Sequence, residues 1–188
     1  MVPEPIGHGT FSTNSDTHFI LIEFLNLHDG LPSEEKFCRQ LAELHRKSME
    51  HSPNGKFGSH LTIRNGTVQQ DTTNYWETFY TRLLKQAFTF DEEAHRPCSE
   101  YSELLPLIYD KVRPRWLRPL ETKGRTIRPA LIHGDLRDGD LRGGNVALQA
   151  HTAQPYIFDS SAVYAHNEYD LHMWRGERFK IRDSYISD

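Results

Sequence analysis

The stretch from residue 129 to residue 159 constrains the fold most, because short apolar runs alternate there with turn-forming residues. ALI at residues 130–132 is predicted to be a short buried strand, and the glycine-rich acidic loop HGDLRDGDLRGG follows it. NVAL at 145–148 and PYIFD at 155–159 are predicted to be two further strands joined by a hairpin turn. The chain therefore presents acidic residues on a tight loop, then an Asn, then a hairpin, then a final Asp.

This order of side chains suits the transfer of a phosphoryl group. Magnesium prefers hard oxygen ligands and usually keeps several waters, so one or two protein ligands are enough. We expect the amide oxygen of Asn145 and the carboxylate of Asp159 to be those ligands. A separate Asp would accept the proton of the acceptor hydroxyl, and protein kinases place that Asp five positions before the Asn. The alternative is that these acidic residues only form turns.

The loop nearly repeats itself, so two Asp residues compete for the role of base. Asp140 lies five positions before Asn145, but Asp138 then stands where a His is expected. Asp135 lies ten positions before Asn145 and keeps both the strand and His133 in front of it. We favour Asp135, because loops tolerate inserted residues at a small cost in entropy.

The first 32 residues are predicted to be the end of a β-region. THFILIEFLNL at 17–27 is rich in β-branched and aromatic residues, and DGLP at 29–32 breaks the run. GHG at 7–9 begins a phosphate-loop pattern, but Ser12 stands where its third glycine is required. An ordinary turn is therefore expected at these glycines.

Residues 33–128 are predicted to be mainly helical. A first helix is expected after Ser33, a plausible N-cap, and a second near Asn74. A third is expected from about Ser99 to the prolines at positions 114 and 119. Apolar residues at helical spacing are expected to face the core. They are Phe37, Leu41, Leu44, Trp76, Phe79, Leu83, Ala87, Leu104, Leu105, Ile108 and Val112.

Charge and composition exclude several classes of partner. The net charge of −4 argues against nucleic acid and anionic membranes as partners. The two cysteines, Cys38 and Cys98, have no clustered spacing, which indicates a reducing compartment. No apolar run approaches the ~18 residues of a membrane span, and the N-terminus does not resemble a signal peptide. We expect a cytoplasmic protein.

Four motifs in order make the chain similar to a known family. They are HGDL at 133–136, GN at 144–145, FD at 158–159 and YAHNEYDL at 164–171. Together they resemble the fructosamine-3-kinase and protein-ribulosamine-3-kinase family, within the wider aminoglycoside-phosphotransferase-like kinases. The resemblance implies ATP- and Mg²⁺-dependent phosphorylation of the 3-hydroxyl of ketosamines, either on glycated protein or as small molecules.

The same resemblance implies an α+β fold of the protein-kinase type. Residues 1–32 would be the end of the N-lobe strands and the hinge, and residues 33–188 a mostly helical C-lobe. Glu23, Phe24 and Leu25 would form the hinge whose backbone reads adenine, although a plain strand end explains them equally well.

Departures from the family pattern keep other functions open. Arg137 or Arg142, depending on register, replaces the family's Trp, and five extra residues add Asp138 and Asp140 to the loop. The family's glycine-rich loop, lysine and helix-C glutamate would precede residue 1, and further helices would follow residue 188. The alternatives are a pseudokinase or binding module and another small-molecule kinase of the same superfamily.

His166, Glu168 and Asp170 have a spacing that allows a metal cluster. The resemblance instead favours structural hydrogen bonds and packing on the substrate side for these residues.

Overall fold

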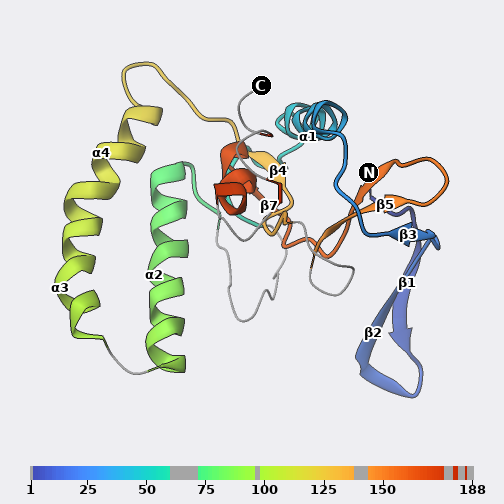
Figure 1. The fold of residues 1–188 in the computed structure, drawn as a ribbon. Coiled ribbons are helices and arrows are strands. Elements are labelled where there is room, and N and C mark those ends of the chain that lie inside the picture. The colour runs from blue at the N-terminus through green and yellow to red at the C-terminus, as the bar shows by residue number, and fades with distance from the viewer. Residues whose placement is uncertain are drawn as a thin grey trace. The chain divides into compact units, whose positions relative to one another are not determined.

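A computed structural model describes residues 2–59, 72–95, 98–137, 144–175, 180–181 and 185. Its small antiparallel sheets and its helices occur in separate runs along the chain, strands first, then helices, then strands again, which confirms the expected α+β class (Figure 1). The chain divides into two compact units. The first comprises Met1–Glu43, Gly134–Ser160 and Asp170–Asp188, and the second comprises Leu44–His133 and Ser161–Tyr169. The lobe boundary between residues 32 and 33 stays a prediction, because it describes a different division of the chain.

A two-stranded hairpin opens the first unit. Strand β1 (Pro5–Phe11) pairs antiparallel with β2 (Asn14–Ile22), from Pro5 opposite Ile22 to Phe11 opposite Asn14. The strand expected at 17–27 therefore begins and ends earlier. The turn expected at residues 7–9 is wrong, because these residues lie within β1 and pair with β2.

A three-stranded sheet carries the hairpin predicted in the second half of the chain. Its order is β3 (Leu27–His28), β5 (Val146–Gln149) and β6 (Pro155–Ile157), all antiparallel. A tight turn joins β5 to β6, with the Gln149 N–H donated to the Gln154 carbonyl at 2.9 Å. Both predicted strands are thus confirmed to within two residues at their ends.

The first helix packs on the C-terminal part of the first unit. Helix α1 (Glu34–Ser48) begins directly after Ser33, as expected, and carries acidic residues in its first turn and basic residues in its last. Phe37 is fully buried and its ring stacks on Trp174, with the centroids 5.9 Å apart. The Tyr185 hydroxyl donates to the Pro32 carbonyl at 2.7 Å and so fastens this region to the start of the helix.

Helices dominate the second unit. Helix α2 (Trp76–Ala94) lies beside a run of α3 (Ser99–Leu107), a π-helical turn (Ile108–Val112), α4 (Arg113–Leu117) and a 3₁₀ turn (Arg118–Glu121) (Figure 1).

The expected end of this last run is confirmed to within two residues, since it ends at Glu121, but its core face needs correction. Each proline stands in the first turn of a new segment, where no N–H is needed. Trp76 and Phe79 are buried as expected, but Leu104 and Val112 are each nearly half exposed, so the core face expected for these two is wrong.

The core of the second unit is aromatic and joins the helices to a short sheet. Strand β4 (Ala130–Ile132) pairs antiparallel with β7 (Val163–Ala165). Phe57, Trp76 and Phe79 pack against these strands in one buried cluster. Strand β7 lies after residue 159, where no strand was predicted. Among the described residues, no helix is long and apolar enough to cross a membrane.

Candidate active site

The loop that follows β4 is fixed at its start by a buried carboxylate. Gly134 has φ = +83°, a left-handed conformation that glycine adopts without steric penalty. Its N–H donates to Oδ1 of Asp170 at 2.8 Å, and Asp170 is fully buried. The structural hydrogen bonding expected for Asp170 is therefore confirmed.

A second point of the same loop, at Leu136, is fixed by the indole of Trp174. Trp174 donates its Nε1–H to the carbonyl of Leu136 at 3.0 Å, and both side chains are buried. Asp170 and Trp174 lie four residues apart in the 3₁₀ segment Asn167–Arg175. The backbone on either side of Asp135 is thus held from one element. Sequence reasoning missed Trp174; its signal was an aromatic residue four positions after an acidic one.

Asp135, the favoured base, projects between these anchors and stays about one-third exposed. Asn145 donates its amide Nδ2 to Oδ2 of Asp135 at 2.9 Å and to the Asp135 carbonyl at 2.7 Å. The Nε–H of Arg137 lies 3.2 Å from Oδ1 and 3.3 Å from Oδ2 of the same carboxylate. The structure therefore joins Asp135 to Asn145 across ten positions of sequence.

Asn145 and Asp159 lie at neighbouring ends of paired strands. Val146 pairs with Ile157, so the residue before β5 faces the residue after β6. The Phe158 N–H accordingly donates to the Asn145 carbonyl at 3.2 Å, and Asp159 is the next residue. Asp159 is exposed and has φ = +56°, a conformation that is sparsely populated outside glycine and concentrated at turns and functional sites.

These donors fit a magnesium ion by their chemistry. With the Asn145 nitrogen donated to Asp135, the oxygen of that amide is the atom suited to a cation, and Asp159 offers an exposed carboxylate. Within the described ranges, no group of three or more His, Cys, Asp or Glu residues could hold a metal. Magnesium does not require such a group, because one or two protein oxygens and several waters satisfy it. The alternative base Asp140, with Asp138 and Arg142, lies outside the described residues.

The expected adenine hinge lies in the segment between β2 and β3. The Glu23 N–H is already donated to the Glu4 carbonyl at 2.9 Å, and the Glu23 carboxylate accepts the Glu4 N–H. Phe24 is 93% exposed and Leu25 is partly buried. The backbone groups that adenine could contact in this stretch therefore begin after the Glu23 nitrogen.

His166 lies in the aromatic core of the second unit. Its Nδ1 accepts the Glu168 N–H at 3.1 Å, and its ring lies 5.8 Å from that of Trp76. Burial lowers the pKa of His166 below its usual value, while the carboxylates of Glu168 and Glu121 oppose the shift. Burial also raises the pKa of Tyr169. The hydrogen bond and the packing support the structural reading of His166 over a metal ligand.

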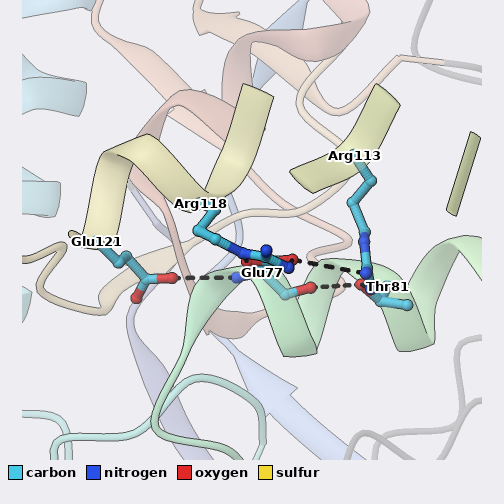
Figure 2. A network of polar contacts seen from close by, with 5 residues as sticks. All are labelled: Glu77, Thr81, Arg113, Arg118 and Glu121. Atoms are coloured by element: carbon cyan, nitrogen blue, oxygen red, sulfur yellow. Dashed lines mark hydrogen bonds and ion pairs between the residues drawn. The ribbon is translucent and has the colours of Figure 1, made fainter. Parts of the chain in front are cut away.

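A polar network holds the N-terminus of α2 (Figure 2). Glu121 accepts the N–H groups of Trp76 and Glu77 at 3.0 and 3.2 Å. Glu77 in turn binds Arg118 at 3.0 Å and Arg113 at 3.5 Å. A hollow of about 410 Å³ opens beside this network. The charged residues of the network pair with one another. We therefore interpret the network as an anchor for helix α2 and not as a second chemical centre.

Solved structures with the same fold define the class of protein. The chain matches a protein described as a fructosamine-3-kinase from Thermobifida fusca with a TM-score of 0.62, at 26% identity over 90% of this chain and 51% of that one. A second such protein, from Haemophilus somnus, matches with a TM-score of 0.63 at 18% identity, over 99% of this chain and 56% of that one. The fold is that of the protein-kinase-like phosphotransferases.

Sequence comparison then gives the family. The chain belongs to the fructosamine kinase family, whose model matches residues 1–181. It is 26% identical over 175 residues to the chloroplastic protein-ribulosamine 3-kinase of Arabidopsis thaliana, covering 92% of this chain and 48% of that protein. It is 35% identical over 118 residues to the mouse ketosamine-3-kinase, covering 62% of this chain and 34% of that protein. The chain spans about half the length of the curated relatives it matches.

Proposed function

We propose that this chain carries the phosphoryl-transfer centre of a ketosamine 3-kinase. The observation that supports it is the direct contact between Asp135 and Asn145, with Asp159 next in sequence to a backbone partner of Asn145. Asn145 binds the Asp135 carboxylate at 2.9 Å, and its carbonyl accepts the N–H of the residue before Asp159. Membership of the fructosamine kinase family and the names of its relatives support the substrate class.

In the proposed reaction, Asp135 acts as the general base. The carboxylate accepts the proton of the ketosamine 3-hydroxyl while the hydroxyl oxygen forms a bond to the γ-phosphorus of ATP. The bond from that phosphorus to the bridging oxygen breaks, and ADP leaves with the electron pair. Asn145 holds the carboxylate in place through its amide hydrogens.

Asn145 and Asp159 would hold magnesium by their oxygens. When bound, this ion neutralises charge on the phosphates. Glu23, Phe24 and Leu25 would contact adenine through backbone groups that follow the Glu23 nitrogen. The base at Asp135, rather than Asp140, is part of this proposal.

The finer features of the function are proposals as well. We propose that the acceptor is a ketosamine on a protein amine or a small-molecule amine, and that the reaction serves the repair of glycated protein. Neither nucleic acid nor membrane is a proposed partner, given the net charge of −4. The cytoplasm is the proposed compartment, supported by the two cysteines, Cys38 and Cys98, which have no clustered spacing.

One observation favours a second function, a nucleotide-binding module without turnover. The Arg137 guanidinium lies on both oxygens of the proposed base, where a substrate hydroxyl would have to bind. Such a module would bind a nucleotide and leave the acceptor unchanged.

Turnover by the 188-residue chain tests the proposal. We expect ADP release from Mg²⁺-ATP that requires a ribulosamine or fructosamine acceptor, and that Asp135→Asn loses at least about a hundredfold in rate. Choline and an aminoglycoside serve as competing acceptors. Faster turnover of either alcohol would assign the chain to another kinase of the superfamily. Binding of nucleotide without turnover of any acceptor would favour the module.

A further inference from the structure

We infer that Arg137 is a positioning residue that restrains the Asp135 carboxylate from the acceptor hydroxyl until the acceptor displaces it. This inference rests on the proposed function, in which Asp135 is the base. It adds a restraint, located in one side chain, that the proposed chemistry does not require.

The contacts of the carboxylate show why a restraint exists. The Asn145 amide donates to Oδ2 of Asp135 at 2.9 Å and holds the carboxylate from that side. The Arg137 Nε–H is shared between the two oxygens, at 3.2 Å from Oδ1 and 3.3 Å from Oδ2. A base must lie about 2.6–3.2 Å from the hydroxyl it deprotonates. The Arg137 guanidinium, close to both oxygens, therefore competes with the acceptor hydroxyl for the carboxylate.

The distances also show which contact yields. N–H···O bonds are most favourable near 2.9 Å, and strong charged pairs are shorter still. The Arg137 contacts are longer than that, whereas both bonds from the Asn145 amide, at 2.7 and 2.9 Å, are not. Asn145 therefore keeps the carboxylate oriented while Arg137 releases it.

The backbone around the base is held by contacts that do not involve the guanidinium. The Arg137 carbonyl accepts the Asn145 N–H at 3.0 Å, which fixes the backbone of Arg137. Trp174 fixes the preceding carbonyl, that of Leu136, at 3.0 Å. The backbone at Leu136 and Arg137 can therefore stay in place when the guanidinium turns away from the base.

The strength of the ion pair between Arg137 and Asp135 follows from the solvent exposure of the two side chains. Side chains of Arg137 and Asp135 are 33% and 35% exposed, so solvent screens the pair and its strength is that of a partly exposed ion pair. Such a pair lowers the share of Asp135 carboxylate that is open to the acceptor by a factor of about 1.5 to 5.

Kinetics of three variants test the restraint. We expect Arg137→Gln to raise kcat/KM for a small ketosamine, the fructose adduct of a simple alkylamine, about 1.5- to fivefold. The KM for ATP should stay within about twofold of wild type, since Arg137 is not assigned to the nucleotide. Arg137→Lys keeps a charge without the Nε–H and should lie between the two. Arg39→Gln, at an exposed arginine paired with Glu35, is the matched control and should leave both constants unchanged. An unchanged or reduced kcat/KM in Arg137→Gln overturns the inference.

A spectroscopic readout works without turnover. The ¹⁵N resonance of the Arg137 Nε–H is expected to differ between wild type and Asp135→Asn, and to shift in wild type when the chain is saturated with ADP and the same ketosamine. If wild type turns over and the acceptor leaves this resonance unmoved, the restraint is refuted while the proposed function stands. If no acceptor is turned over by any variant, the proposed reaction fails and the role given to Arg137 fails with it.

Discussion

Removing the carboxylate of Asp170 should loosen the loop that carries the proposed base. In Asp170→Ala, the Gly134 N–H loses its acceptor at 2.8 Å inside the protein, where Asp170 itself is fully buried. A hydrogen bond to a charged group contributes about 1.5–3 kcal/mol, and an unsatisfied buried donor costs a similar amount. We therefore expect the free energy of unfolding to fall by about 2–3 kcal/mol.

Urea denaturation followed by tryptophan fluorescence measures this change. With a slope of about 2 kcal/mol per molar urea, the midpoint should fall by about 1–1.5 M. Asp170→Asn keeps an oxygen acceptor without the charge and should lose about half as much. The proposed reaction should slow by about a hundredfold in Asp170→Ala even where the chain is folded, because the base is misplaced. Asp29→Ala, at an exposed position, is the control. Equal midpoints for Asp170→Ala and Asp29→Ala would refute the anchoring role.

Three further predictions concern a glycine of the loop, the N-terminus of α2 and a buried histidine. Gly134→Ala should destabilise the chain by about 1–2 kcal/mol in urea unfolding, because φ is +83° there; an unchanged midpoint would contradict this. Glu121→Ala should cost about 1–2 kcal/mol, since the Trp76 and Glu77 N–H groups lose their acceptor, and Glu103→Ala on an exposed turn of α3 should cost little. Because the pKa of His166 is lowered in the folded chain, the unfolded chain binds the proton at a higher pH than the folded chain does. The stability that neutral His166 contributes is therefore present above about pH 6.5 and is lost as pH falls toward the folded pKa. His166→Gln should flatten that part of the stability curve between pH 7.5 and 5, and a curve parallel to wild type would contradict the burial argument.

The strands around the candidate site were predictable because their signals are local. The runs at 130–132 and 145–148 are apolar and bounded by turn-forming residues, and the structure has strands at Ala130–Ile132 and Val146–Gln149. Asn145 and Asp159 come together through the pairing of β5 with β6, which a hairpin already implies. Their order along the chain was therefore sufficient to place them at one end of a sheet.

What sequence reasoning missed depends on contacts between distant residues. Strand β7 has only three residues, too few for an alternation of apolar and polar residues to be recognised, and it is a strand because β4 pairs with it. Trp174 reaches Leu136 across 38 positions, so no local pattern indicates the contact. Val112 closes a π-helical turn, which changes the phase of the helix and leaves this residue nearly half exposed.

The pairing of Arg137 with Asp135 was also not predictable. Sequence reasoning noted that an arginine replaces the family's Trp, but a spacing of two on a loop does not define where a side chain points. The structure brings the Nε–H to 3.2 Å from the carboxylate. Whether this contact restrains a working base or marks a chain without turnover depends on the phosphate site itself.

Calorimetric titration of the 188-residue chain with ATP, with and without magnesium, tests that site most directly. Asp159→Asn and the exposed control Asp29→Asn are titrated beside wild type. We predict that ATP binds in the presence of magnesium, that binding weakens at least tenfold without it or in Asp159→Asn, and that Asp29→Asn binds as wild type does. Equal binding with and without magnesium, or full binding by Asp159→Asn, would contradict the assignment of Asn145 and Asp159 to a magnesium-phosphate site.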